Sequence, residues 1–141
     1  MNLHKKIIIA DDDPDDRNLA SIAFKELNMM HSVDFVTDGQ ELIDSLKNKI
    51  NLSHSLPDVI LLDLNMPRKD GRLALKEIKA NPELCHLNIV VFSTSSAKED
   101  IDYTMSLGAK NYIIKPSGYI ELVNILRSVC EEFVVDSTLK K

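Results

Sequence analysis

Short runs of consecutive apolar residues alternate along this chain with segments whose apolar residues recur at helical spacing. A strand buried on both faces is apolar at consecutive positions, whereas a helix buries one face of period 3.6. The runs predict strands at 5–10, 32–37, 58–62, 88–92 and 111–115. The spaced segments predict helices from Asp13-Pro14 to about 27, then at 40–49, 72–80, 97–107 and 117–134.

The same spacing predicts which side chains face the core. In the first helix, the expected inward stripe is Leu19, Ile22, Ala23 and Leu27. In the last helix, the expected stripe is Ile120, Val123, Leu126 and Val129.

Strict alternation of strands and helices indicates a single parallel sheet with helices on both faces, joined by right-handed crossovers. The predicted fold class is α/β: a flavodoxin-like, doubly wound, five-stranded parallel sheet of order 2-1-3-4-5. In that order the first and third strands are neighbours, and ligands bind at the carboxyl ends of the strands near this switch point.

Composition narrows the function classes. The chain has 141 residues, enough for one domain with a sizeable core. Its net charge of −5 argues against non-specific nucleic-acid binding, which needs a basic surface. Apolar runs are too short to span a membrane, and Cys85 and Cys130 lack metal or redox spacing. We therefore expect a cytoplasmic protein with reduced thiols and no nucleic-acid or membrane partner.

The most informative segment is the acidic run 11–16, with Pro14 as its only uncharged residue, directly after the first predicted strand. Such a cluster is repulsive, since two unit charges about 5 Å apart cost roughly 3 kcal/mol at an effective dielectric near 20. A bound divalent cation is the simplest use for it. Asp13, Asp15 and Asp16 have a simpler interpretation as an N-cap and first-turn acids favoured by the helix dipole.

Polar residues with complementary chemistry end the other predicted strands: Asp63, Ser93 and Lys115 follow or close strands three, four and five. Together with Asp11 and Asp12 they form a phosphoryl-transfer set. The acids can hold Mg²⁺ or Mn²⁺, one carboxylate can attack phosphorus, and the hydroxyl and ammonium can neutralise phosphoryl oxygens.

These residues lie in segments that resemble the receiver domains of two-component response regulators. The matching segments are IIIADDD (7–13), VILLDLNMPRKDG (59–71), VVFSTS (90–95) and SLGAKNYIIKP (106–116). The order and intervals of all four are specific, and the resemblance covers nearly the whole chain. The long connection 48–56 resembles the subgroup that serves phytochrome-type or hybrid kinases.

The resemblance implies residue roles. Asp63 would be the phosphoacceptor, and Asp11, Asp12, Asp63 and the backbone carbonyl of Asn65 would bind the metal. Ser93 and Lys115 would contact the phosphoryl group. Tyr112 would be an aromatic switch that turns inward when Ser93 moves, and a cis peptide bond before Pro116 would aim the lysine.

The resemblance also implies partners and domain organisation. Residues 1–134 would be a receiver domain, and 135–141 a short polar tail with no output domain. The phosphoryl donor would be a histidine kinase or phosphotransfer protein, and the downstream protein target is left open, as is the choice between a monomer and a weak homodimer. Such a chain is a signalling phosphoacceptor in a phosphorelay rather than an enzyme, apart from self-catalysed phosphoryl transfer and autodephosphorylation.

Three other functions fit part of the pattern. A haloacid-dehalogenase-like phosphatase also uses an Asp nucleophile, but needs a second acid where this chain has Asn65. A flavodoxin-like FMN binder needs a hydroxyl- and glycine-rich phosphate loop, where this chain is anionic. An interaction module that works without phosphorylation is the third alternative.

Overall fold

A computed structural model describes residues 5–134, and the tail proposed for 135–141 lies outside these residues. The strands form one parallel sheet of order β2-β1-β3-β4-β5, as the sequence predicted. Their bounds are β1 Ile7–Ala10, β2 Val33–Val36, β3 Val59–Leu62, β4 Ile89–Ser93 and β5 Asn111–Ile114. The predicted strand positions are confirmed to within one or two residues at each end.

Five α-helices connect or follow the strands. Their bounds are α1 Pro14–Glu26, α2 Gly39–Asn51, α3 Gly71–Ala80, α4 Lys98–Ser106 and α5 Tyr119–Phe133. A short 3-10 helix at Met30–Ser32, which the sequence analysis did not predict, precedes β2. No helix within 5–134 is long and apolar enough to cross a membrane.

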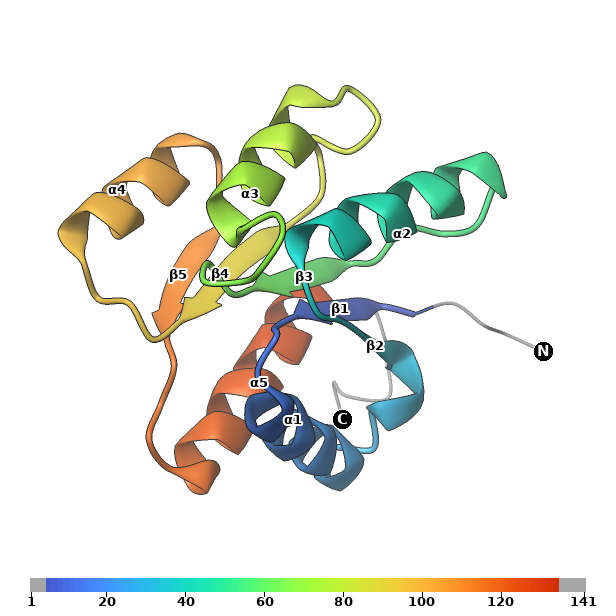
Figure 1. Cartoon of the computed structure of the whole chain (residues 1–141). Helices are drawn as coiled ribbons and strands as arrows, with labels where there is room; N and C mark the ends of the chain where they lie inside the picture. The colour runs from blue at the N-terminus through green and yellow to red at the C-terminus, as the bar shows by residue number, and fades with distance from the viewer. Residues whose placement is uncertain (1–4, 135–141) are drawn as a thin grey trace.

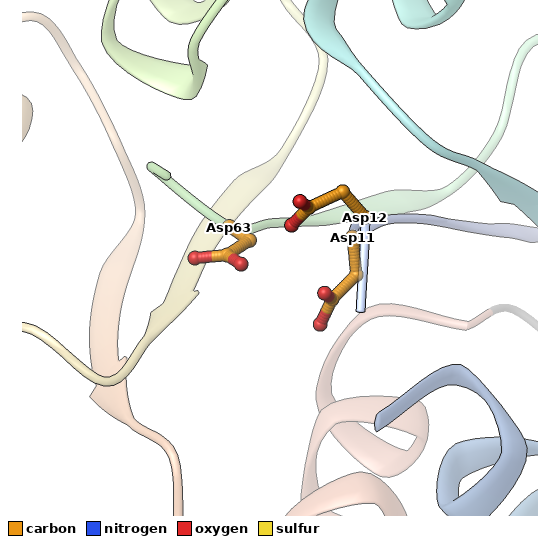
Figure 2. A group of neighbouring side chains, drawn as sticks. All are labelled: Asp11, Asp12 and Asp63. Atoms are coloured by element: carbon orange, nitrogen blue, oxygen red, sulfur yellow. The ribbon is translucent and has the colours of Figure 1, made fainter. Parts of the chain in front are cut away.

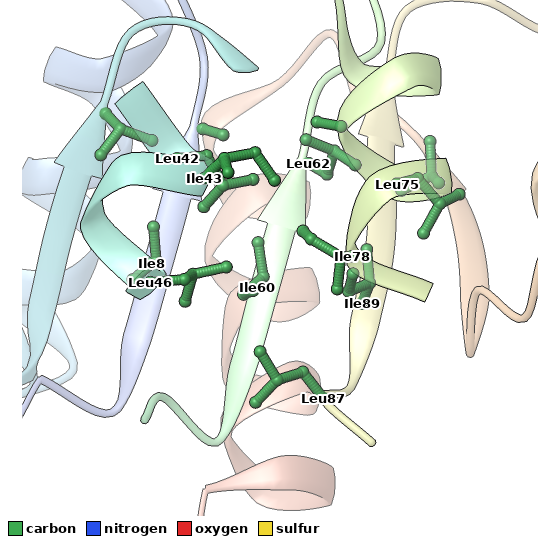
Figure 3. Close-up of a cluster of buried hydrophobic side chains, with 14 of the residues drawn as sticks. Ile8, Leu42, Ile43, Leu46, Ile60, Leu62, Leu75, Ile78, Leu87 and Ile89 are labelled. Carbon is green, nitrogen blue, oxygen red and sulfur yellow. The ribbon is translucent and has the colours of Figure 1, made fainter. Parts of the chain in front are cut away.

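The helices cover both faces of the sheet. Figure 1 shows α1 and α5 packed side by side on one face, with α2, α3 and α4 on the other. Each face has its own core. Figure 3 shows the core under α2 and α3, where Ile8 and Ile60 of the central strands meet Leu46 and Ile78 of the helices. Burial of both sheet faces explains why the strands are continuously apolar.

The inward face of α1 differs from the expectation. Leu19 and Ile22 are 41% and 46% exposed. Ala20, Ala23 and Phe24 are the residues buried against the sheet. Two stripes of helical period overlap in this segment, and the small alanines allow the helix backbone to approach the sheet closely.

The expected stripe of α5 is wrong at one position. Ile120 is 76% exposed, whereas Val123, Leu126 and Val129 are buried as expected. Ile120 lies in the first turn of α5, where the chain has only just left the loop after β5. Leu122 takes its place in the core on this face of the sheet.

Side-chain caps fix where the helices near the acidic run and the third strand begin. Asp13 accepts a hydrogen bond from the Asp15 amide, and Pro14 occupies the first turn, as the sequence predicted. Asp38 and Asp70 cap α2 and α3 in the same way. These caps hold the loops at the carboxyl ends of β1, β2 and β3 in fixed positions.

The two ends of the described chain lie away from these loops. All five strands run parallel, so β1 begins at the edge opposite to the acidic loops. The last helix returns to that edge, where Phe133 lies beside Leu56 and Asp58 at the start of β3.

Gly71 gives a test of how tightly the loop after β3 is packed. A β-carbon at this position would lie 2.2 Å from the carbonyl oxygen of Asp63 and 2.8 Å from the α-carbon of Leu64. Because backbone atoms cannot move aside cheaply, we expect Gly71→Ala to lower the free energy of unfolding by about 1–3 kcal/mol. Urea denaturation measures this change.

Gly118→Ala is the matched control. Its β-carbon would meet only the end of the Glu121 side chain, at 2.8 Å, which can rotate away. We expect this variant to lose less than about 1 kcal/mol. Equal losses in the two variants would contradict the packing argument.

Candidate phosphoacceptor and metal site

Three carboxylates meet at the carboxyl ends of two neighbouring strands. Asp11 and Asp12 follow β1, and Asp63 follows β3 (Figure 2). One oxygen from each lies within 4.8 Å of the others. Asp11 and Asp63 are buried, while Asp12 is exposed. The prediction that these three acids converge is confirmed.

Lys115, which directly follows β5, places its ammonium group among these acids. Its Nζ lies 2.7 Å from Asp11 Oδ2 and 3.3 Å from Asp63 Oδ2. Burial alone would lower the pKa of Lys115, but hydrogen bonds to Asp11 and Asp16 outweigh burial, and the net shift is upward. The ammonium therefore stays charged at any physiological pH.

Burial acts in the opposite direction on Asp11. It raises the pKa of the Asp11 carboxyl, since the charged form loses hydration, while hydrogen bonds from Lys115 and from the Asp13 amide partly oppose the rise. A buried acid that is costly to ionise is well placed to gain from an added cation.

Asp16 is a partner of Lys115 that the sequence analysis did not identify. Its Oδ2 lies 2.8 Å from Lys115 Nζ. The sequence analysis assigned Asp16 to the helix dipole, which was a sufficient local explanation. The available signal was its position: Asp16 precedes the buried Ala20 and Ala23 by four and seven residues, so it lies on the inward face of α1.

Two other predicted site residues lie close by. Ser93 ends β4 fully buried, and its hydroxyl oxygen accepts a hydrogen bond of 3.3 Å from the Ser95 amide. Asn65 lies in the loop after β3, and its backbone amide donates a hydrogen bond to Asp63 Oδ1 at 3.4 Å. Ser93, at the end of β4, and Asn65, in the loop after β3, therefore lie at the same edge of the sheet as the acids.

The prediction of a cis peptide bond before Pro116 is wrong. No peptide bond is cis within the described chain. Lys115 reaches the acids from a trans peptide, because the parallel pairing of β5 with β4 already directs it: the Lys115 amide donates to the Ser93 carbonyl at 2.9 Å.

A polar network connects Tyr112 to the third and fourth helices. The Tyr112 hydroxyl donates to the Ser95 carbonyl at 2.7 Å, and the Ser95 hydroxyl donates to Asp100 Oδ2 at 2.7 Å. Arg72 binds both oxygens of Asp100, at 2.8 Å each. The network thus links the loop after β4, the first turn of α3, the first turn of α4, and β5.

Tyr112 is half-buried and packs against the core under α2 and α3. Its ring is therefore already partly turned inward here, with its hydroxyl anchored on the loop that follows Ser93.

The donor set fits a hard divalent cation. Mg²⁺ and Mn²⁺ prefer oxygen ligands, and three carboxylates supply these with an excess of negative charge. Asp12 is exposed to solvent, whereas the Lys115 ammonium contacts the two buried carboxylates, those of Asp11 and Asp63. A cation beside Asp12 would relieve the repulsion among the three carboxylates, which the single charge of Lys115 does not balance.

The fold and this pocket define a phosphoacceptor signalling domain, and sequence comparison agrees. The profile of the response regulator receiver domain family matches residues 7–127. The chain therefore belongs to the response regulator receiver family, which decides against the dehalogenase-like and FMN-binding alternatives.

Its relatives include stand-alone regulators of similar length. The response regulator Rcp1 of Synechocystis sp. is 31% identical over 91% of this chain and 88% of its own. The phosphorylated cyanobacterial phytochrome response regulator RcpA superposes with a TM-score of 0.83 at 37% identity, covering 94% of this chain and 95% of RcpA. The Mn²⁺-bound form of Rcp1 gives a TM-score of 0.78 at 27% identity, covering 94% and 96%.

The Arg72–Asp100 pair predicts a pH-dependent contribution to stability. Hydrogen bonds from Arg72, and secondarily Ser95, lower the pKa of Asp100 below its usual value. The stabilisation is therefore present above the unfolded-state pKa of about 3.9 and is lost as pH falls through the lower folded-state pKa. We expect Asp100→Asn to cost about 1 kcal/mol at pH 7, with the difference from wild type shrinking as the pH falls below the unfolded-state pKa.

Urea unfolding at a series of pH values measures this difference. Asp102→Asn is the control, because the ion pair of Asp102 within residues 5–134 is with the exposed Lys98, 2.6 Å away on the same helix. It should change stability less at pH 7. A pH-independent cost for Asp100→Asn would show that the carboxylate charge is not what Arg72 recognises.

Proposed function

We propose that this protein accepts a phosphoryl group on Asp63 from the phosphohistidine of a histidine kinase or phosphotransfer protein, and that this changes a protein-binding surface. The observation that carries the proposal is the convergence of Asp11, Asp12 and Asp63, with the ammonium group of Lys115 bound to Asp11 and Asp63. Clustered acids with a single fixed cation suit an incoming phosphoryl group that needs both a nucleophile and positive charge.

Asp63 is the nucleophile in this proposal. One of its carboxylate oxygens forms a bond to phosphorus, the bond between phosphorus and the donor histidine nitrogen breaks, and that electron pair returns to the imidazole. The product is an aspartyl phosphate. Asp63 suits this role because it is held in place: Gly71 packs against its carbonyl oxygen, and the Asn65 amide contacts its side chain.

The surrounding residues neutralise charge. Lys115 keeps its proton and binds a phosphoryl oxygen, and the Ser93 hydroxyl donates to another. Asp11, Asp12, Asp63 and the Asn65 carbonyl would hold Mg²⁺ or Mn²⁺, as the Mn²⁺-bound form of the relative Rcp1 suggests. When bound, the cation supplies positive charge for the phosphoryl oxygens.

Phosphorylation would be transmitted through Ser93 and Tyr112. As the Ser93 hydroxyl follows the phosphoryl oxygens, the loop that starts there moves, and Tyr112, which is bonded to the Ser95 carbonyl, moves further inward. Asp100 accepts a hydrogen bond from the Ser95 hydroxyl and is bound by Arg72. Movement of the loop would therefore also shift α4, which carries Asp100. The surface of α4, β5 and α5 is the one that would change, by a population shift of a few kcal/mol at most.

The proposal extends to the cellular role. The protein would act as a receiver over residues 1–134, as a phosphoacceptor rather than an enzyme with its own substrate. Similarity to RcpA, a phytochrome response regulator, favours a phytochrome-type kinase as donor. We expect the protein to work in the cytoplasm, without contact to nucleic acid or membrane, as a monomer or weak homodimer that binds a separate protein target.

Incubation with acetyl phosphate and Mg²⁺ tests the acceptor role. Wild-type protein should gain the mass of one phosphoryl group in intact-protein mass spectrometry. Asp63→Asn should gain none, because an amide is not a nucleophile toward phosphorus.

Asp58→Asn is a control for loss of a carboxylate just before β3, at the opposite end of the strand from Asp63, and should be phosphorylated normally. If wild-type protein gains no phosphoryl group under these conditions, the interaction-module alternative replaces the acceptor role.

Metal binding should be visible as a change in stability. Millimolar Mg²⁺ should raise the melting temperature of the wild-type protein, because the cation binds the folded state only. Asp12→Ala should be more stable than wild type without metal, since one repulsive charge is gone, and should lose the response to Mg²⁺. Differential scanning fluorimetry with and without EDTA measures both effects, and a full Mg²⁺ response in Asp12→Ala would remove Asp12 from the ligand set.

A further inference from the structure

Lys115 has a third acidic partner, Asp16, whose position differs from that of the other two. Asp11 and Asp63 come from strand ends and are buried, whereas Asp16 comes from the first turn of α1 and its side chain is 37% exposed. The three acceptors lie 2.7, 3.3 and 2.8 Å from Nζ, respectively. An ammonium group has three N–H donors, so these three carboxylates can occupy all of them.

A phosphoryl group on Asp63 therefore cannot bind Lys115 unless one N–H leaves its present acceptor. The N–H directed at Asp63, the longest contact at 3.3 Å, can pass to a phosphoryl oxygen, but a second N–H becomes available to the phosphoryl group only if Asp11 or Asp16 releases it. Asp11 is a poorer candidate for release than Asp16, because its side chain is only 4% exposed and water cannot readily replace the ammonium there. Asp16 is the acceptor that water can solvate when the lysine leaves.

The surroundings of Asp16 leave room for this exchange. Asp16 and Lys115 line one end of a surface cavity that continues between α1 and the start of α5, bordered by Leu19, Pro116 and Tyr119. Because the Asp16 side chain is 37% exposed and borders this cavity, water can solvate its carboxylate when the ammonium leaves.

We propose that Asp16 is a positioning residue that holds Lys115 while Asp63 is unphosphorylated and releases it to the phosphoryl group. Its negative charge competes with the phosphoryl oxygens for the same ammonium, so Asp16 lowers the affinity of the pocket for a phosphoryl group. This inference rests on the proposed acceptor role of Asp63. It adds Asp16 as a residue that sets how favourable the phosphorylated state of Asp63 is.

Asp15 provides a matched comparison. It is the neighbouring acid in the same helical turn, fully exposed, and within the described chain no ion pair joins it to Lys115. Asp15→Asn and Asp16→Asn remove the same charge one residue apart. If Asp16 serves only the helix dipole, the two variants should behave alike.

The experiment is a titration with beryllofluoride, a phosphoryl mimic, at saturating Mg²⁺, followed by amide NMR. We expect Asp16→Asn to bind beryllofluoride about three- to tenfold more tightly than wild type, because one competing charge a few ångströms from the mimic is gone. Asp15→Asn should stay within about twofold, since an exposed charge is screened. Asp16→Glu, which restores the charge, should return toward the wild-type affinity.

A second readout needs neither metal nor phosphoryl mimic. In ¹⁵N-labelled protein without Mg²⁺, the Lys115 ammonium signal should shift and exchange faster with water in Asp16→Asn, but not in Asp15→Asn. Melting curves of both variants confirm that they are folded.

The outcomes separate the two claims. Equal affinities for Asp15→Asn and Asp16→Asn, or weaker binding by Asp16→Asn, would overturn the role of Asp16 while wild-type phosphorylation still supports the acceptor function. Failure of the wild-type protein to gain a phosphoryl group from acetyl phosphate would instead overturn the proposed function itself.

Discussion

The ion-pair arrangement around Lys115 is the interaction on which the pocket depends. Two buried carboxylates at neighbouring strand ends would repel each other strongly in the low dielectric of the interior. The Lys115 ammonium lies between them and gives each a partner. Because Lys115 follows the edge strand β5 while the acids follow the central strands, the parallel sheet itself brings opposite charges together across its carboxyl edge.

The pocket is connected to the protein surface through polar contacts rather than through the apolar core. Arg72 lies in the first turn of α3, after the loop that holds Asp63, and it binds Asp100 of α4 with two hydrogen bonds. Ser95 and Tyr112 complete the path to β5. Such contacts have discrete alternatives, since a hydrogen bond can be exchanged for another, so they suit two-state behaviour better than close-packed side chains do.

The sequence predicted the sheet well because strands buried on both faces leave a strong local signal. It predicted the acids, Lys115 and Ser93 because each directly follows or closes such a strand. The core-facing side of α1 was harder to predict from the sequence. Leu19 and Ile22 have the same period as the alanines that are buried, and periodicity alone cannot choose between two overlapping stripes.

Polar contacts between residues far apart in the sequence were the other feature that the sequence did not predict. Asp16 and Lys115 are 99 residues apart, and Arg72 and Asp100 are 28 apart. No local pattern specifies such pairs, and each member has an adequate local role as a first-turn residue or a surface charge. An acid on the inward face of a helix, four and seven residues before buried alanines, is the one signal that could have identified Asp16.

The layout of the sheet also separates the chemistry from the chain ends. Strand β1 starts, and helix α5 finishes, at the edge of the sheet opposite to Asp63. The described residues 5–134 therefore begin and end at the edge of the sheet away from the Asp63 carboxylate. The same geometry makes the unit modular, since it can be inserted into a larger polypeptide without rebuilding its reactive edge.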